Sequence, residues 1–169
     1  MLPDAVGEDG VVSAQDGERL VVVDGSRAFS VDPVNLAPVG AVAVDAGTVP
    51  FVRGDQVYLV ADGVVRWLDP VSLEQRKAVA VPGRADAEID GDGNLWVLTP
   101  RDGVLRRIRE GAVEVEAPVV AAGGRVELTL AGNRPVAVAH DERKVAFVDP
   151  GDVRVGSEVS VSRTGVVQG

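Results

Sequence analysis

The sequence predicts an all-β fold built from one short antiparallel sheet that is repeated four times. The main observation is a turn series with a nearly constant spacing of 38, 40 and 39 residues. A second turn series keeps the same period, with spacings of 38, 39 and 39 residues. Regular self-similarity of this length is typical of repeat architectures. The first series is Asp24-Gly25, Asp62-Gly63, Asp102-Gly103 and Asp141-Glu142, and the second is Asp16-Gly17, Gly54-Asp55, Gly93-Asn94 and Gly132-Asn133.

Composition agrees with short strands joined by tight turns. Valine supplies 37 of the 169 residues, and 20 glycines and 10 prolines lie between the apolar runs. Val-rich runs bounded by Gly, Pro, Asn and Asp are typical of strands and turns. Only residues 72–78 have a composition that suits a helical turn, and a segment so short is not stable as an isolated helix.

Each period divides into four strand positions, which we name A to D. In the second period we expect strands at residues 48–52, 57–60, 64–68 and 78–81. Asp62-Gly63 between two apolar runs is a strong hairpin signal, because both turn residues must reach positive φ. The same scheme predicts sheets at residues 9–45, 46–83, 84–122 and 123–163, with residues 164–169 starting a further strand.

Sheets of this size cannot bury both faces alone, so the copies must stack face to face. Four-stranded units of about 40 residues arranged around an axis are the blades of a β-propeller. The alternative is a β-sandwich, which does not require equal spacing of every turn type. The sequence therefore favours a β-propeller of four blades, each a four-stranded antiparallel meander.

Both chain ends resemble parts of further blades. Leu2-Pro3 resembles Val81-Pro82, and residues 163–169 follow the last D position, where another A strand would begin. We therefore expect the chain to be a segment of a larger propeller. The exposed ends of an open arc are costly, so more chain, a second copy or closure of a four-blade ring would cover them.

Two short motifs resemble known propeller families. The segment Asp92-Gly93-Asn94-Leu95-Trp96-Val97 resembles the turn and strand of NHL-type and streptogramin-lyase-type blades. The segment Arg66-Trp67-Leu68-Asp69-Pro70, followed by Leu73, is similar to the closing part of YVTN-type and quinoprotein-type blades. The lyases imply a catalytic histidine, and His140 is the only histidine in this chain. The quinoproteins imply Trp-rich repeats, which two tryptophans do not supply.

The charge balance argues against several partners. A net charge of −9 and a pI near 4.6 repel phosphate backbones and anionic lipids, so we expect no nucleic acid partner. No run reaches the length of a membrane span, and Met1-Leu2-Pro3-Asp4 does not begin a signal peptide. We therefore expect a soluble chain. Cysteine is absent, which excludes thiol catalysis and thiolate metal sites but leaves the compartment open.

In an antiparallel meander the B–C turns and D–A loops share one end of the sheets, and we predict binding there. Loops on a rigid scaffold commonly carry binding residues. Aspartates in tight turns also have a purely conformational explanation, whereas Arg84, Arg101 and His140 are required by no turn. The predicted binding residues are Arg84, Asp86, Arg101, Asp102, Arg125, His140 and Asp141.

Metal and catalytic sites have little support. Asp90, Asp92 and Asn94 alternate oxygen donors that could ligate Ca²⁺, but an EF-hand would need Gly at position 95 and an acid at position 101. The chain has Leu95 and Arg101 there. His140-Asp141 lacks the Gly-x-Ser-x-Gly elbow that exposes a serine nucleophile. We predict no catalytic residue and no cofactor.

The resulting functional prediction is a non-enzymatic scaffold that binds a protein, a peptide or a glycan through loops on one face. It would suit a module of a larger bacterial surface or secreted protein. The alternative is part of a catalytic propeller, lyase-like or quinoprotein-like, with most active-site residues outside this chain. A spacer with no ligand is a third interpretation.

Overall fold

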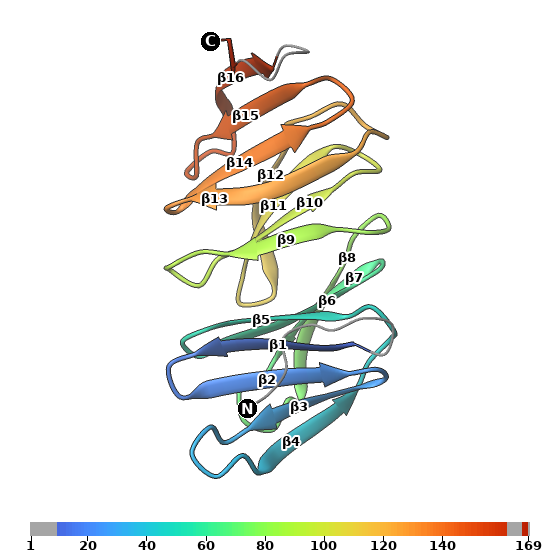
Figure 1. The fold of residues 1–169 in the computed structure, drawn as a ribbon, viewed down its shortest axis with the longest axis vertical. Helices are drawn as coiled ribbons and strands as arrows, with labels where there is room; N and C mark the ends of the chain where they lie inside the picture. The colour runs from blue at the N-terminus through green and yellow to red at the C-terminus, as the bar shows by residue number, and fades with distance from the viewer. Residues whose placement is uncertain (1–9, 162–166, 169) are drawn as a thin grey trace. The chain divides into compact units, whose positions relative to one another are not determined.

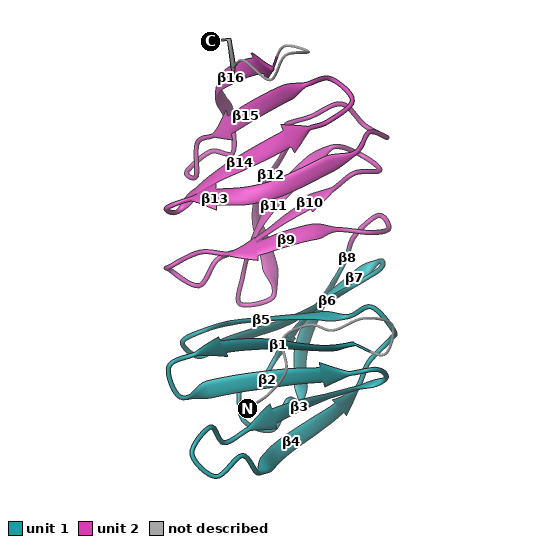
Figure 2. Cartoon of the chain, in the orientation of Figure 1, with its two compact units in different colours: residues 1–80 teal, residues 81–169 magenta. Residues whose placement is uncertain are grey.

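A computed structural model describes residues 10–161 and 167–168 of the chain, and these residues form 17 strands and no helix (Figure 1). The expectations about Leu2-Pro3 and about residues 162–166 and 169 lie outside the described residues. The chain divides into two compact units, residues 1–80 and 81–169 (Figure 2). No described residue belongs to a helix that could cross a membrane.

The first unit contains two four-stranded antiparallel sheets, in each of which the strands follow one another in chain order. The first sheet is β1 (Val11–Asp16), β2 (Arg19–Asp24), β3 (Arg27–Val31) and β4 (Pro38–Ala43). The second sheet is β5 (Val49–Arg53), β6 (Gln56–Ala61), β7 (Val64–Leu68) and β8 (Gln75–Ala80).

The second unit repeats this plan. Its first sheet, the third of the chain, is β9 (Asp86–Ile89), β10 (Leu95–Thr99), β11 (Val104–Arg109) and β12 (Ala112–Pro118). The fourth sheet is β13 (Val126–Ala131), β14 (Arg134–Ala139), β15 (Lys144–Val148) and β16 (Val155–Val161). The short strand β17 (Val167–Gln168) pairs with β16 as a fifth strand.

Alternate residues of a strand point to the same side of its sheet. Each sheet therefore presents an apolar face to the other sheet of its unit, and the two faces pack together. In the first unit, Val21 and Val23 of β2 meet Val57 and Leu59 of β6 in one buried cluster. Small branched side chains allow this close approach of two sheets. The second unit has an equivalent core, which contains the larger side chain of Trp96.

These features confirm the all-β prediction and the β-propeller fold, with four antiparallel four-stranded meanders. In the second period the observed strands match the expected A, B and C strands closely, whereas the D strand begins at Gln75, earlier than expected. Residues 72–78, whose composition suits a helical turn, form the end of a turn and the start of β8. Asp69 binds the main chain of the turn, and the next residues pair with β7.

Candidate functional site

Four loops of the second unit lie at the same end of its sheets, and we call this set the rim. They are the D–A loops 81–85 and 119–125 and the B–C turns 100–103 and 140–143. Antiparallel pairing of consecutive strands brings these segments to one end. All seven predicted binding residues belong to this unit, and only Asp86 lies in a strand instead of a loop.

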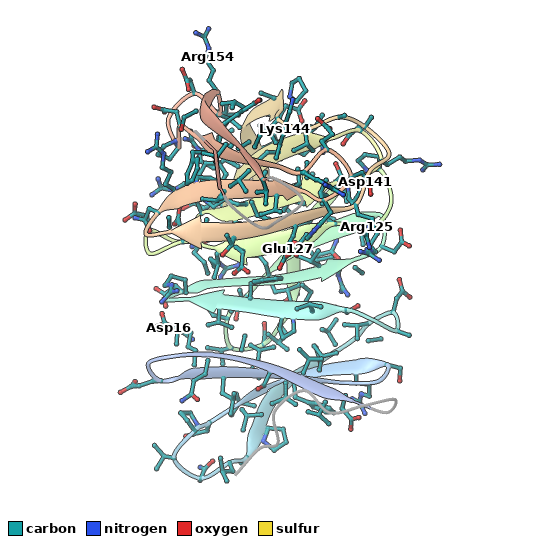
Figure 3. The ribbon with its side chains drawn as sticks, turned by 45° about the horizontal axis from the view of Figure 1, so that its top comes forward. Asp16, Arg125, Glu127, Asp141, Lys144 and Arg154 are labelled. Carbon is teal, nitrogen blue, oxygen red and sulfur yellow. The ribbon has the colours of Figure 1, made fainter. Side chains whose placement is uncertain are left out.

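The fourth sheet brings several of these residues together. Arg125 donates its main-chain N–H to Asp141 Oδ2 at 3.0 Å, and its Nε lies 3.6 Å from Asp141 Oδ1. His140 Nε2 lies 3.2 Å from Glu127 Oε2, and the His140 N–H donates to the Arg125 carbonyl. Figure 3 shows Arg125, Glu127 and Asp141 close together, away from Arg154. Loop 119–125 and turn 140–143 are thus joined by hydrogen bonds.

Further charged groups extend this cluster. Glu142 Oε1 accepts a hydrogen bond from the Ala121 N–H at 3.3 Å, and Lys144 Nζ lies 3.8 Å from Glu142. Lys144 also lies 3.9 Å from Glu158 on β16. These contacts are exposed, so each contributes little to stability. Of these contacts, the hydrogen bond between Glu142 and Ala121 is the one that joins the two loops.

Three rim arginines have no ion-pair partner among the described residues: Arg84, Arg101 and Arg143. All three are exposed. Arg143 has φ 54°, a left-handed conformation that Gly103 adopts at the matching position of the preceding sheet. A non-glycine residue there carries a backbone cost. The turn therefore places a cation where glycine would fit better.

The two ends of the second unit differ in charge. The rim loops carry four arginines, Arg84, Arg101, Arg125 and Arg143, against three acids, Asp102, Asp141 and Glu142. The turns at the opposite end, residues 90–94, 110–111, 132–133 and 149–154, carry one arginine and five acids. Arginines are therefore concentrated at the rim end of the second unit, although the chain as a whole is acidic.

Asp102 is held inside a hydrogen-bond network. Its Oδ1 accepts from Thr99 Oγ1 and from the Val104 N–H, and its Oδ2 accepts from Arg106 Nη2 at 2.9 Å. Burial alone would raise the pKa of Asp102, but the hydrogen bonds from Thr99, Arg106 and Val104 lower it below its usual value. Arg106 also binds Glu116 at 2.9 Å. Sequence reasoning placed Asp102 on the rim without detecting this network.

Asp86 joins two sheets. Its Oδ2 accepts the Leu128 N–H of β13 at 2.6 Å, so the third and fourth sheets are connected at this point. Glu88 is its neighbour on the same side of β9, and the sequence analysis did not single it out. Burial raises the pKa of the Glu88 carboxyl, and the charge of Asp86 raises it further.

In the candidate calcium loop, residues 90–94, the carboxylate of Asp90 accepts hydrogen bonds from N–H groups. Asp90 Oδ1 accepts from the Asp92 and Asn94 main-chain N–H groups, at 2.9 and 3.0 Å. Its Oδ2 accepts from Asn94 Nδ2 and from Trp96 Nε1, at 3.0 and 2.9 Å. These donors engage both carboxylate oxygens of Asp90, as in a structural turn, whereas Asn94 Oδ1 is buried without a hydrogen-bond partner among the described residues. In the described part of the chain, no group of three or more His, Cys, Asp or Glu side chains is arranged to hold a metal ion.

His140 lies in an exposed setting. Its side chain is 43% exposed, and that of its partner Glu127 is 64% exposed. General acid–base catalysis works best when the groups are shielded and placed against a bound substrate. Both side chains of this His-Glu pair are open to solvent, a setting that does not favour such catalysis.

The first unit has a groove that the sequence did not reveal. Its volume is about 330 Å³, and it lies between the A–B turn of the first sheet and the C–D turns of both sheets. Its walls include Val34, Val39 and Val71, which are exposed. Arg19 at its edge is paired with Asp55 at 2.6 Å. The groove therefore lies at the end of the sheets opposite to the B–C turns.

No protein-family model matches the sequence, and no curated protein sequence matches it. Solved structures of β-propeller proteins do match the fold. Apo AztD from Citrobacter koseri is similar with a TM-score of 0.72 and 18% identity, over 89% of this chain and 46% of that chain. BamB from Moraxella catarrhalis is similar with a TM-score of 0.70 and 17% identity, over 92% of this chain and 55% of that chain.

A third similar structure is the dihydro-heme d1 dehydrogenase NirN in complex with DHE. Its TM-score is 0.70 and its identity 17%, over 86% of this chain and 37% of that chain. The chain thus spans about half or less of the length of these solved structures. Identities this low show a common fold, and the roles of these proteins differ.

Proposed function

We propose that this chain is a non-enzymatic β-propeller scaffold whose rim binds an acidic segment of a protein or peptide. The observation that carries the proposal is the set of exposed rim arginines without an ion-pair partner among the described residues, Arg84, Arg101 and Arg143. They lie on a chain with a net charge of −9. A rigid sheet scaffold with such loops needs no further chemistry to bind a partner.

Arginine suits this role because its planar guanidinium forms two parallel hydrogen bonds to one carboxylate. The acidic surface elsewhere repels polyanions, so an acidic partner is directed to the rim and not to the rest of the chain. The ion pair of Arg125 with Asp141 and the pair of His140 with Glu127 hold the neighbouring loops in place. Preformed loops lower the entropic cost of binding.

A glycan partner is less well supported. The exposed large apolar side chains among the described residues are all valine or leucine, so no exposed aromatic ring accompanies the rim arginines. A sulfated glycan would still offer anionic groups to the same arginines. A sulfated glycan therefore serves as a second probe in the binding experiment.

The test is an NMR titration of the ¹⁵N-labelled chain with a poly-glutamate peptide, and in parallel with heparin. We expect chemical-shift changes from the peptide that are confined to loops 81–85, 100–103, 119–125 and 140–143. The changes should weaken as salt is added, because exposed charges are screened. Stronger binding of heparin than of the peptide would indicate that the partner is a sulfated glycan and not an acidic peptide. No shift with either probe, or shifts centred away from the rim, would refute it.

Variants sharpen this experiment. Arg143→Gly removes one cation and at the same time relieves the left-handed backbone, so we expect weaker peptide binding together with about 1 kcal/mol of added stability. Arg84→Ala and Arg101→Ala should weaken binding and leave stability within about 0.5 kcal/mol. Arg154→Ala is the control, since Arg154 is also exposed but lies in a C–D turn away from the rim, where its Nε is 3.6 Å from Asp152. An equal loss of binding in Arg154→Ala would mean that only total charge matters.

A further inference from the structure

The C–D turns of the first, second and fourth sheets are built in the same way. Each begins with Asp-Pro, and the carbonyl of its aspartate accepts the N–H of an apolar residue four positions later. The three apolar residues are Leu36, Leu73 and Val153, at distances of 2.7, 2.9 and 2.9 Å. Their φ angles are 59°, 60° and 58°, a left-handed conformation that such side chains rarely adopt.

In the second and fourth sheets this apolar residue is buried against the preceding sheet. Leu73 is 0% exposed and packs in the core that contains Val21 and Val23 of the first sheet. Val153 is 0% exposed and packs in the core that contains Trp96 and Leu98 of the third sheet. An unfavourable backbone conformation persists where surrounding contacts hold it, and here the preceding sheet supplies those contacts.

The main chain of each turn also rests on the preceding sheet. Ser30 Oγ of β3 donates to the Val71 carbonyl at 2.5 Å. Gly40 of β4 leaves room for this approach, because a Cβ at that position would overlap the same carbonyl. In the second unit, Arg107 Nη1 of β11 donates to the Pro150 carbonyl at 2.5 Å. Each turn therefore has a docking position on the strands of the sheet before it.

The turn of the first sheet has the same construction but no such docking position among the described residues. Leu36 is 56% exposed and Val34 is 91% exposed. Two apolar side chains of this turn therefore face solvent, one of them on an unfavourable backbone. Leu36 is thus an exposed apolar residue at the position that is buried in the other two turns, and such exposure marks an interaction surface.

The fourth sheet offers a matching surface. Phe147 lies two residues before Asp149, as Ser30 lies two residues before Asp32, so it occupies the position on which the next turn would dock. Ala146 and Val148 belong to the core shared with the third sheet, and Phe147 therefore faces the other side of the fourth sheet. Phe147 is half-buried and pairs across the strands with Val136. The docking position is apolar, and so is Leu36, which would pack on it.

We propose that two copies of this chain pair head to tail, with the Leu36 turn of each copy docked on the Phe147 face of the other. About a two-fold axis the same contact forms twice, once from each copy, so neither surface is left free. The similar solved structures are about twice as long as this chain or longer, which leaves room for a second set of four sheets. This proposal does not depend on the rim or its arginines.

The test is sedimentation velocity of the full chain over a range of concentrations. We expect a species of twice 17.5 kDa that dissociates on dilution. Leu36→Asn should weaken this dimer about tenfold or more, because the apolar contact is lost. The variant should fold normally, since asparagine tolerates the left-handed conformation better than leucine. Val113→Asn, a change at an exposed valine of β12, is the control and should leave the dimer unchanged.

Mixing two variants tests the head-to-tail arrangement. Phe147→Ser should weaken the dimer as Leu36→Asn does. A mixture of the two retains one contact in which both native residues meet, so the mixture should form more dimer than either variant alone. A monomeric wild-type chain, a dimer insensitive to Leu36→Asn, a failure of the mixture to recover dimer, or growth beyond a dimer would each overturn the proposal.

Discussion

The two units of the chain use the same pair of sheets but join them by different chemistry. In the first unit the A–B turns are linked by ions: Asp16 Oδ2 accepts the Gly54 N–H at 2.5 Å, and Arg19 binds Asp55 at 2.6 Å. In the second unit the same turns are linked by an amide, since Asn133 accepts from the Gly91 N–H and donates to Asp92. The spacing of the sheets is therefore compatible with either kind of contact.

The hydrophobic cores of the two units also differ in composition. The core of the first unit is made of valine, alanine and leucine, whereas the second includes Trp96, whose indole N–H binds Asp90 at 2.9 Å. The third sheet also contains the network of Thr99, Asp102 and Arg106. It lacks the Asp-Pro turn of the other three sheets. Buried polar contacts thus accompany the copy whose turn sequence has changed most.

The largest expected effect is loss of the Trp96 side chain. Trp96→Ala should lower the free energy of unfolding by about 3–5 kcal/mol, because it removes a large, fully buried side chain from the core of the second unit. Leu59→Ala, the comparison in the first unit, should cost about 2–5 kcal/mol. Urea denaturation measures both. A Trp96→Ala cost below about 1 kcal/mol would mean that the indole is not packed as described.

Removal of Asp90 should have the next largest effect. Asp90→Ala leaves the indole N–H of Trp96 and the amide of Asn94 without their acceptor, so we expect a loss of about 1–3 kcal/mol. Asp16→Ala, the change in the corresponding turn of the first unit, should cost about 0–1 kcal/mol because its ion pair is exposed. Equal costs in urea denaturation would contradict the difference between the two units.

The pH dependence tests the C–D turns of both units. Main-chain hydrogen bonds from Ser72 and Val71 lower the pKa of Asp69 from 3.8 to about 2, and those from Gly151 and Asp152 lower the pKa of Asp149 below its usual value. A lowered folded pKa adds stability above the unfolded pKa. That stability is lost as the pH falls from about 4 through the folded pKa.

Carboxyl titration by NMR should give a midpoint near 2 for Asp69, and Asp69→Asn should reduce the change in unfolding free energy over this acidic range. Asp149→Asn is the matched change in the second unit. A midpoint for Asp69 close to 3.8 would show that the turn does not form its hydrogen bonds in solution.

The smallest expected effect is that of the ion pair between the first two A–B turns. Arg19→Ala should lower the unfolding free energy by about 0–1 kcal/mol, and the difference should shrink with added salt. Asn133→Ala, in the amide-linked turns of the second unit, should show no such salt dependence. Identical salt responses would remove the distinction between ionic and amide links.

The repeat and its strands could be predicted from the sequence because turn residues carry strong local signals. The Asp62-Gly63 hairpin and the A–B turns were located from glycine, asparagine and aspartate alone. The β8 strand was placed too late in the chain, because the composition of residues 72–78 suits a helix. The hydrogen bond that Asp69 accepts from the main chain of the turn and the pairing with β7 override this helical preference.

The candidate site was less predictable because it depends on contacts between copies. The sequence located the rim loops but not the bond between Asp86 and Leu128, which joins residues 42 positions apart. It also missed the groove beside Val34 and the unpaired state of Arg143. Such features follow from how sheets pack, and local turn signals carry no information about that packing.

Amide hydrogen exchange followed by NMR tests the repeated-sheet arrangement most directly. The two inner strands of every sheet are paired on both sides, so their amides should be the slowest to exchange. These strands are β2 and β3, β6 and β7, β10 and β11, and β14 and β15. Protection should therefore peak four times along the chain at intervals close to the sequence period, with fast exchange in the turns between. A protection pattern without this recurrence, or a protected helix at residues 72–78, would contradict the account.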